Sequence, residues 1–368
     1  MRYYDKILKY IFIFFILFTG CQKKVESDYK IGFVASLSGK YSELGTSIRN
    51  GVILAVNEIN QKGGINGKKI ELIIKDNKHN KNENIKVLKE LINKNIKVIV
   101  GNATSSMTKI SLPIINKNKV LMISPTASSN IFAKKDDYLF RLTHSNNQKT
   151  FQPVVKYLNS QNVNKVLIIY DNKNESYTKN WISLFQKTFN KKNKIITINQ
   201  PFNNIKKEIL NFNPDGIIII ANGLDSALLI QKLNLHQIKK PIVCSGWAKD
   251  KSFLENGGNA IKNVKLLGSI DMEAKNTKLI EFKKRYKNYF KEDANSFALR
   301  GYEAILVIAQ ALKIEPDISK LKNTILKINN FEGIIGKIKF DKYGDIDRKT
   351  EYLYKIQNGK FVRDEKFK

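Results

Sequence analysis

A loop of small hydroxylated residues, GNATSSMTK, occupies positions 101–109 directly after the apolar run IKVIV. Hydroxyl groups in such a loop can cradle a phosphate, present a nucleophilic serine, or hold the carboxylate of a ligand. A second loop of this kind, SPTASSN at 124–130, follows the apolar run KVLMI. In an open parallel sheet the carboxyl ends of the strands form the ligand crevice, and the next helix offers unpaired N–H groups to an anion. The two loops together favour a ligand site, although each serine alone could equally cap a helix.

The sequence lacks the motifs that would make either loop catalytic or phosphate-binding. The stretch GGINGKK at 63–69 has three residues between Gly63 and Gly67, where a phosphate loop needs four, and Lys69 stands where Ser or Thr is required. Ser105 does not lie in a G-x-S-x-G motif, which would mark it as a nucleophile. A serine hydrolase would also need a base within hydrogen-bond reach of this serine. We therefore expect a binding protein and no enzyme, with a hydrolase at Ser105 as a less favoured alternative.

Metal ions and cofactors are not predicted. The three histidines, His79, His144 and His236, are not at metal-ligand spacing and have no cysteine pair to support them. The dinucleotide pattern G-x-G-x-x-G is missing after the first predicted strand, where ASLSGKYSELG stands. Cys244 ends the apolar run PIVC, and we expect it to be a buried thiol.

The chain is strongly basic, with 64 Lys and Arg against 33 Asp and Glu and a formal net charge of +31. Its lysines are scattered at helical spacing among Asn, Glu and Ile, as in NKHNKNENIKVLKELINKNIK. Arginines and aromatic residues, which read or stack on bases, are not interleaved with them. The pattern is typical of a solvated basic face, and we expect no nucleic acid partner.

The amino terminus reads as an export signal. Residues 1–20 combine early basic residues with a short apolar core and end in small residues before Cys21. The apolar stretch is too short for a membrane span of about 20 residues. The sequence FTGC resembles the bacterial lipoprotein box, in which the cysteine carries the lipid. We therefore expect a signal peptide at 1–20, lipidation of Cys21, a polar tether at 21–29, and anchoring to the extracytoplasmic side of a membrane.

Short runs rich in Ile and Val alternate with amphipathic segments from residue 30 onward, which predicts parallel sheets covered by helices on both faces. Two series of four strands follow one another, which indicates an α/β protein with two doubly wound lobes. The predicted strands are KIGFVASL, KIELIIK, IKVIVG and KVLMISP in the first series, and NKVLIIYDN, KIITIN, PDGIIIIAN and PIVCSG in the second. After the first strand we expect a helix capped by Thr46 or Ser47 and stopped by Gly63 and Gly64. The tail, with a strand at VKLLGSIDM, two helical segments in 277–313 and a β-rich end, completes these lobes.

The run from IGFVASLSGKYSELG to ELIIKDN, continued by VIVGNATSSMTKISLPIINKNKVLMISPTAS, resembles the branched-chain amino-acid (Leu/Ile/Val) binding family. These are the type I periplasmic solute-binding proteins of ABC transporters. The resemblance extends through FRLTHSNNQ and VLIIYDN to FDKYGD and covers nearly the whole mature chain. It implies two Rossmann-like lobes joined by three crossovers and closing on ligand. The boundaries expected are 30–144 with 270–348 for the N-terminal lobe, and 145–269 with 349–368 for the C-terminal lobe.

The resemblance also implies ligand-binding residues. Ser105 corresponds to a side-chain ligand of the substrate carboxylate, in the segment from Asn102 to Ser105 that faces the ligand. The second loop matches where the family grips amino and carboxylate groups, and the other lobe supplies residues after its strand ends. The residues expected at the site are Asn102, Ala103, Thr104, Ser105, Thr126, Ala127, Ser128, Tyr177, Leu224, Trp247 and Arg300.

One departure from the family concerns the ligand's ammonium group. Amino-acid binders of the family carry an acidic residue where SGWAKD stands here, so Gly246 or Trp247 occupies that position. A buried ammonium would lose its charge partner, which costs on the order of several kcal/mol. Three carboxylates are candidates to replace the missing acid: Asp225, Asp250 and Asp271. Trp247 could instead cover an apolar, planar or cationic ligand, and Arg300 could bind a ligand carboxylate.

The sequence therefore predicts a substrate-binding lipoprotein that captures a small amino-acid-like or related organic solute and delivers it to an ABC permease. Closure of two lobes about a hinge would be driven by the ligand's higher affinity for the closed form. A ligand-sensing receptor subunit of the same fold is the alternative. The chain itself carries no output domain that the sequence reveals.

Overall fold

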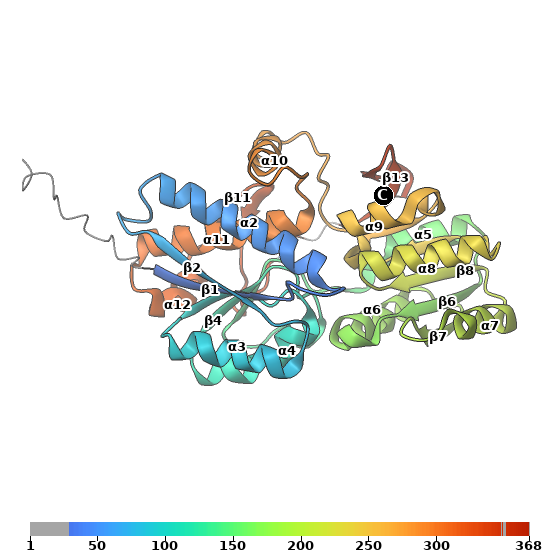
Figure 1. Ribbon diagram of the computed structural model, residues 1–368, viewed down its shortest axis with the longest axis horizontal. Coiled ribbons are helices and arrows are strands. Elements are labelled where there is room, and N and C mark those ends of the chain that lie inside the picture. Colours follow the sequence, from blue (N-terminus) through green and yellow to red (C-terminus); the bar gives the residue numbers. More distant parts are fainter. Residues whose placement is uncertain (1–28, 347, 349–350, 368) are drawn as a thin grey trace, which may run out of the picture.

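The computed structural model describes residues 29–346, 348 and 351–367, which form two lobes side by side along the long axis of the molecule (Figure 1). The predicted signal peptide, Cys21 and all but the last residue of the tether lie outside the described residues. Within the described part, no helix combines the length and the apolar character that crossing a membrane requires.

The first lobe is built on a five-stranded, fully parallel sheet in the order β2-β1-β3-β4-β5. The faces of the strands alternate as expected, so that Ile31 and Phe33 of β1 pack under one helix layer and Val34 under the other. Its first elements are β1 (Tyr29–Ala35), α2 (Ser42–Gln61), β2 (Ile70–Asp76), α3 (Lys81–Asn93), β3 (Val98–Gly101), α4 (Ser105–Lys117), β4 (Leu121–Ser124) and β5 (Leu139–Arg141). Figure 1 shows α2 on one side of this sheet and α3 and α4 on the other.

The second lobe contains a seven-stranded sheet in the order β14-β13-β10-β9-β8-β6-β7, in which β13 pairs antiparallel with both β10 and β14. The elements that follow the first lobe are α5 (Gln152–Ser160), β6 (Lys165–Tyr170), α6 (Glu175–Thr188), β7 (Lys192–Thr197), α7 (Phe202–Phe212), β8 (Gly216–Ile220), α8 (Gly223–Leu235), β9 (Ile242–Cys244), α9 (Lys251–Gly257) and β10 (Lys265–Gly268). Helices α5 and α6 pack on one face of this sheet, and α7, α8 and α9 on the other.

The tail contributes elements to both lobes. It contains α10 (Thr277–Phe290), α11 (Ser296–Ile314), α12 (Leu321–Lys327), β11 (Phe331–Gly333), β12 (Gly336–Ile338), β13 (Tyr352–Gln357) and β14 (Lys360–Arg363). Helix α11 packs along α2 in the core of the first lobe, whereas β13 and β14 extend the second sheet. The described elements therefore place three passages between the lobes: after β5, after β10, and between β12 and β13.

Helices α2 and α11 approach each other closely because a glycine faces the partner helix on each side. A Cβ atom on Gly51 would lie 1.9 Å from the carbonyl oxygen of Ala298, and one on Gly301 would lie 2.2 Å from that of Ile48. Only glycine permits such an approach. This contact fixes the position of Arg300, the neighbour of Gly301, under the junction of the lobes.

Two details of the first lobe differ from the sequence prediction. The sheet has a fifth strand, β5, which is only three residues long and ends in the fully buried Arg141, so neither its length nor its composition marked it as a strand. Helix α2 begins at Ser42, earlier than predicted. Thr46 does not cap it, because its hydroxyl donates back to the carbonyl of Ser42 from inside the helix, at 2.9 Å. The predicted stop is confirmed: Gly63 and Gly64 both have positive φ after the helix end.

Candidate functional site

A cavity of about 780 Å³, its open mouth included, lies between the lobes. Its walls come from strand ends of both sheets and from all three crossover segments. The lining residues are Leu44, Ala103, Thr104, Ser105, Thr126, Ser128, Thr143, Asn146, Thr150, Asn174, Tyr177, Trp181, Gly246, Trp247, Lys249, Leu267, Gly268, Ser269, Ser296, Phe297, Arg300 and Glu351. The cavity thus lies where the strand order of each sheet reverses, which is where doubly wound folds bind ligands.

The first lobe contributes a wall of hydroxyl groups around the start of α4. Thr104 is the N-cap residue of α4, yet its side chain makes no capping hydrogen bond. Its Oγ1 atom is buried and has no hydrogen-bond partner among the described residues. Ser105, the first residue of the helix, is 2% exposed. A buried hydroxyl without a hydrogen-bond partner destabilises the folded chain. A ligand oxygen or water in the cavity would supply that hydrogen bond.

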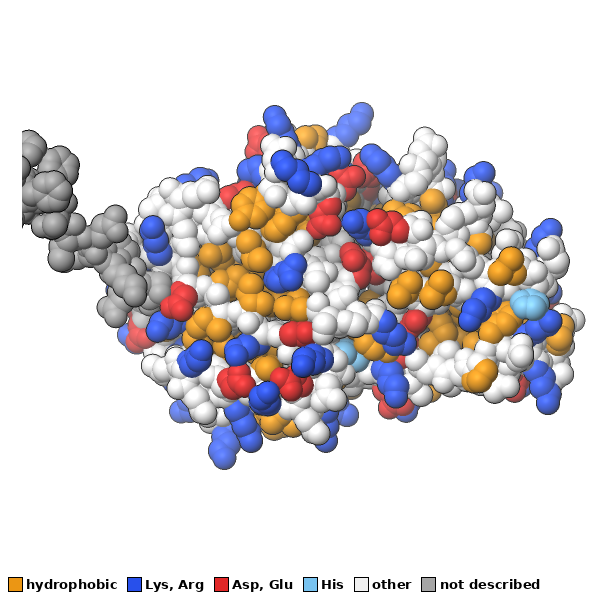
Figure 2. Space-filling model, viewed as in Figure 1, with side chains coloured by type: hydrophobic (Ala, Val, Ile, Leu, Met, Phe, Trp, Pro, Cys, Tyr) orange, Lys and Arg blue, Asp and Glu red, His pale blue; other side chains and the backbone are white. Residues whose placement is uncertain are grey.

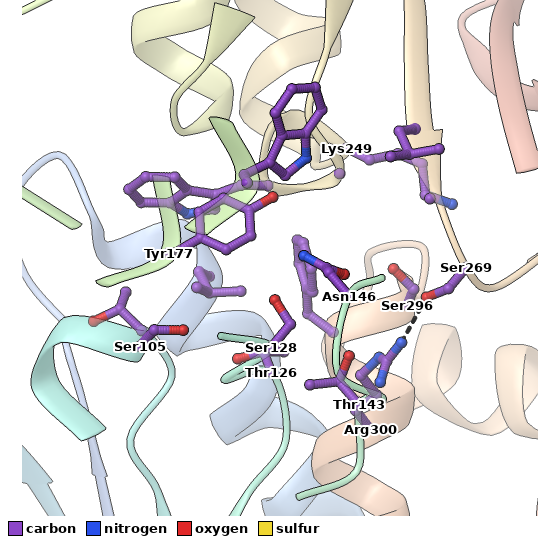
Figure 3. Close-up of a pocket in the computed structure, with 18 of the residues that line it drawn as sticks. Ser105, Thr126, Ser128, Thr143, Asn146, Tyr177, Lys249, Ser269, Ser296 and Arg300 are labelled. Atoms are coloured by element: carbon purple, nitrogen blue, oxygen red, sulfur yellow. Dashed lines mark hydrogen bonds between the residues drawn. The ribbon is translucent and has the colours of Figure 1, made fainter. Parts of the chain in front are cut away.

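The two hydroxylated loops are held together behind this wall. Thr126 Oγ1 donates to the carbonyl of Ala103 at 2.5 Å, and Ser124 Oγ donates to the carbonyl of Asn102 at 2.7 Å. The loops after β3 and β4 therefore form one preorganised surface, and Ser105 and Ser128 lie on the same side of the cavity (Figure 3).

The second lobe contributes aromatic rings. Tyr177 and Trp247 meet edge to face with ring centroids 6.0 Å apart. Trp247 also stacks on Tyr41 of the first lobe, again at 6.0 Å. Burial raises the pKa of Tyr177 well above its usual range, so its hydroxyl remains a neutral hydrogen-bond donor. Trp181, also of α6, is a further lining residue, so three aromatic side chains of the second lobe face the cavity.

Arg300 occupies the side of the cavity away from Ser105 (Figure 3). Its Nη1 atom donates to the carbonyl of Leu142 and its Nη2 atom to Ser269 Oγ, the latter at 2.7 Å. These partners belong to the first and second crossover segments, so Arg300 links two of the three crossovers by hydrogen bonds. Burial lowers the pKa of Arg300 to about 10, and the guanidinium stays charged at neutral pH.

Lys249 lies at the same side of the cavity, and its ammonium group is turned into the second lobe. It donates to the carbonyl of Ile270 at 3.0 Å and lies 3.9 Å from the centroid of the Tyr354 ring. Burial lowers the pKa of Lys249 to about 8. The described residues contain no carboxylate in ion-pair contact with it.

Glu351, in the third crossover, is the one carboxylate among the described lining residues. Its Oε1 atom lies 2.7 Å from Nε2 of His144, in the first crossover. The charge of Glu351 also acts on Lys249 and Arg300, because it favours the protonated form of both. The three charged lining residues are thus two cations and one carboxylate that already has a partner.

The structure brings most of the predicted site residues together. Eight of them line the cavity: Ala103, Thr104, Ser105, Thr126, Ser128, Tyr177, Trp247 and Arg300. Three others, Asn102, Ala127 and Leu224, are not among the lining residues.

Asn102 lies beneath the cavity because its side chain is taken up by a buried network. Its Oδ1 atom accepts from Asn77 Nδ2 at 2.6 Å, and its Nδ2 atom donates to Ser111 Oγ at 2.6 Å. Ala127 is fully buried, and its carbonyl accepts from Arg141 Nη1 at 3.2 Å. Leu224 lies in the first turn of α8, outside the lining.

None of the three carboxylates considered as replacements for the missing acid lines the cavity. Asp225 pairs with Lys40 at 2.8 Å. Asp250 caps α9 by accepting from the N–H of Phe253, and burial raises its pKa to about 8. Asp271 lies 4.0 Å from Arg363. The sequence prediction missed Glu351 because it lies in a crossover whose position only the fold reveals.

Three other unpredicted lining residues also belong to crossovers, Thr143 and Asn146 to the first and Ser269 to the second. For Thr143 and Asn146 the sequence signal was the resemblance of FRLTHSNNQ to the family pattern. Other unpredicted lining residues lie on helices, among them Trp181 of α6 and Phe297 of α11.

A two-lobed α/β protein whose cavity is lined by both lobes and by three crossovers is a bilobal solute-binding protein. A model of the periplasmic binding protein family matches residues 28–360, and the chain belongs to that family. The family and fold are those of substrate-binding proteins of ABC transporters, which are not enzymes.

Curated relatives match most of the chain at low identity. The chain is 23% identical to the Leu/Ile/Val-binding protein BraC3 of Rhizobium johnstonii, over 92% of this chain and 94% of that protein. It is also 23% identical to the leucine-, isoleucine-, valine-, threonine- and alanine-binding protein of Pseudomonas aeruginosa, over 86% and 87% of the two chains.

Solved structures agree with the fold. LivJ of Streptococcus pneumoniae, a branched-chain amino acid transporter substrate-binding protein in complex with isoleucine, is 26% identical with a TM-score of 0.81, over 91% of this chain and 99% of that chain. An ABC transporter solute-binding protein of R. palustris in complex with benzoate is 20% identical with a TM-score of 0.80, over 91% and 94% of the two chains. At 20% identity the latter likeness concerns the fold alone.

Proposed function

We propose that this chain is the extracytoplasmic substrate-binding component of an ABC importer, which captures a small organic solute between its lobes. The observation that carries the proposal is the hydroxyl wall at the start of α4, where Thr104 Oγ1 is buried without a partner. The solute's carboxylate would accept from Ser105 and Thr104 at the positive end of the helix. Relatives named as amino-acid-binding proteins support capture of a solute of similar size.

The remaining walls hold the rest of the solute. Thr126 and Ser128 extend the hydroxyl wall, Ala103 flanks it, and Tyr177 and Trp247 cover the solute from the second lobe. The two lobes, with the boundaries expected from sequence, would close over the solute. The closed form would then be the one that the permease engages.

A ligand screen with a matched pair of variants tests this proposal. The thermal unfolding of the mature chain is followed with small carboxylates and amino acids, since a ligand at 100 times its dissociation constant adds about 2.7 kcal/mol of stability. For the best probe, Ser105→Ala should weaken binding roughly tenfold, the effect of one charge-assisted hydrogen bond. Ser319→Ala, at an exposed 3-10 turn before α12, should leave binding unchanged. Equal binding by wild type and Ser105→Ala, or no response to any probe, contradicts the proposal.

Membrane attachment through Cys21 is a separate part of the proposal, supported by the FTGC motif. Cells producing the full chain would be fractionated. The Cys21→Ser variant should leave the membrane fraction, because lipidation supplies the apolar chains that hold the protein there. Cys244→Ala, which alters a buried thiol in β9, should remain in it. Retention of both variants would argue against lipid anchoring.

A further inference from the structure

The two ends of the cavity differ in charge. Figure 3 shows Ser105 at one side and Ser269, Arg300 and Lys249 at the other. The Ser105 end presents neutral hydroxyl groups and a helix N-terminus. The opposite end presents a buried guanidinium and lies against a buried ammonium. A solute that fills the cavity must therefore place one of its ends against positive charge.

Arg300 is the central group of this end. Its partners, the carbonyl of Leu142 and the hydroxyl of Ser269, are neutral, and no described carboxylate forms an ion pair with it. It is nevertheless only 8% exposed. A buried cation without an ionic partner is costly, and an anionic or carbonyl group of a ligand is the natural complement.

No described acid is free to hold an ammonium group at this end. Glu351 is the only candidate in the lining, and its carboxylate already lies 2.7 Å from His144. It also lies within electrostatic reach of Lys249 and Arg300. An ammonium brought to Glu351 would meet two like charges.

We propose that the solute is an organic acid without an ammonium group, whose end remote from Ser105 presents a carboxylate or carbonyl oxygen to Arg300. This inference rests on the proposed function, because it assumes that the Ser105 end holds a carboxylate. It makes Arg300 a specificity-determining residue that attracts a hydrogen-bond acceptor and repels ammonium. The body of the solute lies between the hydroxyl wall and the rings of Tyr177 and Trp247.

Matched pairs of probes test the inference, because each pair differs only where ammonium is exchanged for a carbonyl oxygen. Suitable pairs carry the exchanged group at the end remote from the carboxylate: 4-aminopentanoate with 4-oxopentanoate, and 5-aminohexanoate with 5-oxohexanoate. Glutarate is added as a probe with a carboxylate at both ends. Calorimetric titration of the mature chain should give at least tenfold tighter binding of the oxo acid than of the amino acid in every pair with a measurable member.

Two variants test whether Arg300 determines the preference for the oxo acid over the amino acid. In Arg300→Gln the ratio of the two affinities should fall toward one, while Arg49→Gln, which removes an arginine of α2 outside the cavity lining, should keep it. Arg300 also links two crossovers, so its replacement changes the affinity for both members of a pair. The measured quantity is therefore the ratio of the two affinities. If Arg300→Gln does not fold, Trp247→Glu is the second variant: a carboxylate in the cavity wall should shift the ratio toward the amino acid.

The outcomes separate the inference from the proposed function. Tighter binding of the amino acids by the wild type, with loss of binding in Ser105→Ala, would overturn the inference and leave the proposed function standing. If that amino-acid binding is also lost in Glu351→Gln, Glu351 is the ammonium partner instead. Failure of every amino acid, oxo acid and dicarboxylate to bind would overturn both.

Discussion

At the scale of single residues, the site is distinguished by charged groups that are buried without the usual partner. Lys249 shows this clearly: its ammonium group rests on the ring of Tyr354 and on the carbonyl of Ile270 instead of on a carboxylate. A cation over an aromatic face is attracted by the ring quadrupole, but less strongly than water holds an ammonium. Keeping Lys249 charged in the folded chain therefore lowers the free energy of unfolding.

The pH dependence of stability should reveal this cost. The pKa of Lys249 falls from 10.5 in the unfolded chain to about 8 in the folded one. Between these values the unfolded chain binds the additional proton, so the free energy of unfolding contributed by Lys249 rises with pH. From pH 7.5 to 9.5 the wild type should gain up to about 2 kcal/mol relative to Lys249→Met. Urea unfolding at both pH values measures this difference, and identical changes in the two proteins would contradict it.

At the scale of elements, a buried amide network determines where the hydroxylated loop can lie. Asn77, Asn84 and Asn102 bond to one another or to Ser111, and so connect the end of β2, helix α3, the end of β3 and helix α4. Each of these groups is removed from water and satisfied by a neighbour. Asn102 therefore supports the lining from below, because its side chain is engaged in this network.

Removal of this support should affect folding more than it affects contact with the solute. Asn102→Ala leaves one N–H of the Asn77 amide without its acceptor, whereas Ser111 Oγ keeps its bonds to Asn84 and Met107. One unsatisfied buried group costs about 1–3 kcal/mol, and chemical denaturation should show a loss of this size. Ser105→Ala, which breaks no hydrogen bond recorded among the described residues, serves as the control and should unfold within about 0.5 kcal/mol of the wild type. Wild-type stability of Asn102→Ala would refute the supporting role.

At the scale of the whole molecule, the lobes touch across the mouth of the cavity. Tyr41 donates to Asp171 at 2.9 Å, and Lys40 pairs with Asp225 at 2.8 Å. The N–H of Ser106 at the start of α4 donates to Asn174 of the second lobe at 3.1 Å. These bonds exist only while the lobes are together, so they stabilise the closed form specifically.

Loss of one such bond should weaken solute binding without altering the cavity. Tyr41→Phe keeps the ring that stacks on Trp247 but removes the hydroxyl bonded to Asp171. Since one hydrogen bond contributes about 0.5–1.5 kcal/mol, we expect affinity to fall roughly 2- to 10-fold. Small-angle scattering of the ligand-free protein should show a larger radius of gyration than for the control Tyr343→Phe, in a turn of the tail. Unchanged affinity and dimensions would show that the contact does not bias closure.

Local sequence determined much of this protein. Runs of Ile and Val separated by amphipathic segments were enough to predict two α/β lobes, because strand and helix periodicity follow from neighbouring residues. The loops after β3 and β4 were recognisable because the carboxyl ends of parallel strands meet at one edge. Short elements such as β5, with its buried Arg141, carried too little of this pattern.

The tertiary structure decided which residues share the cavity. Arg300 lies on a helix that joins the first lobe from the far end of the chain, and its guanidinium reaches Leu142, 158 positions away. Glu351 and His144 meet only because the first and third crossovers run together. Such pairings depend on how the lobes are joined and not on local pattern. The sequence by itself therefore determined the fold, the hydroxyl end of the site and the candidate Arg300, whereas the folded chain alone brings Lys249 and Glu351 to the same end as Arg300.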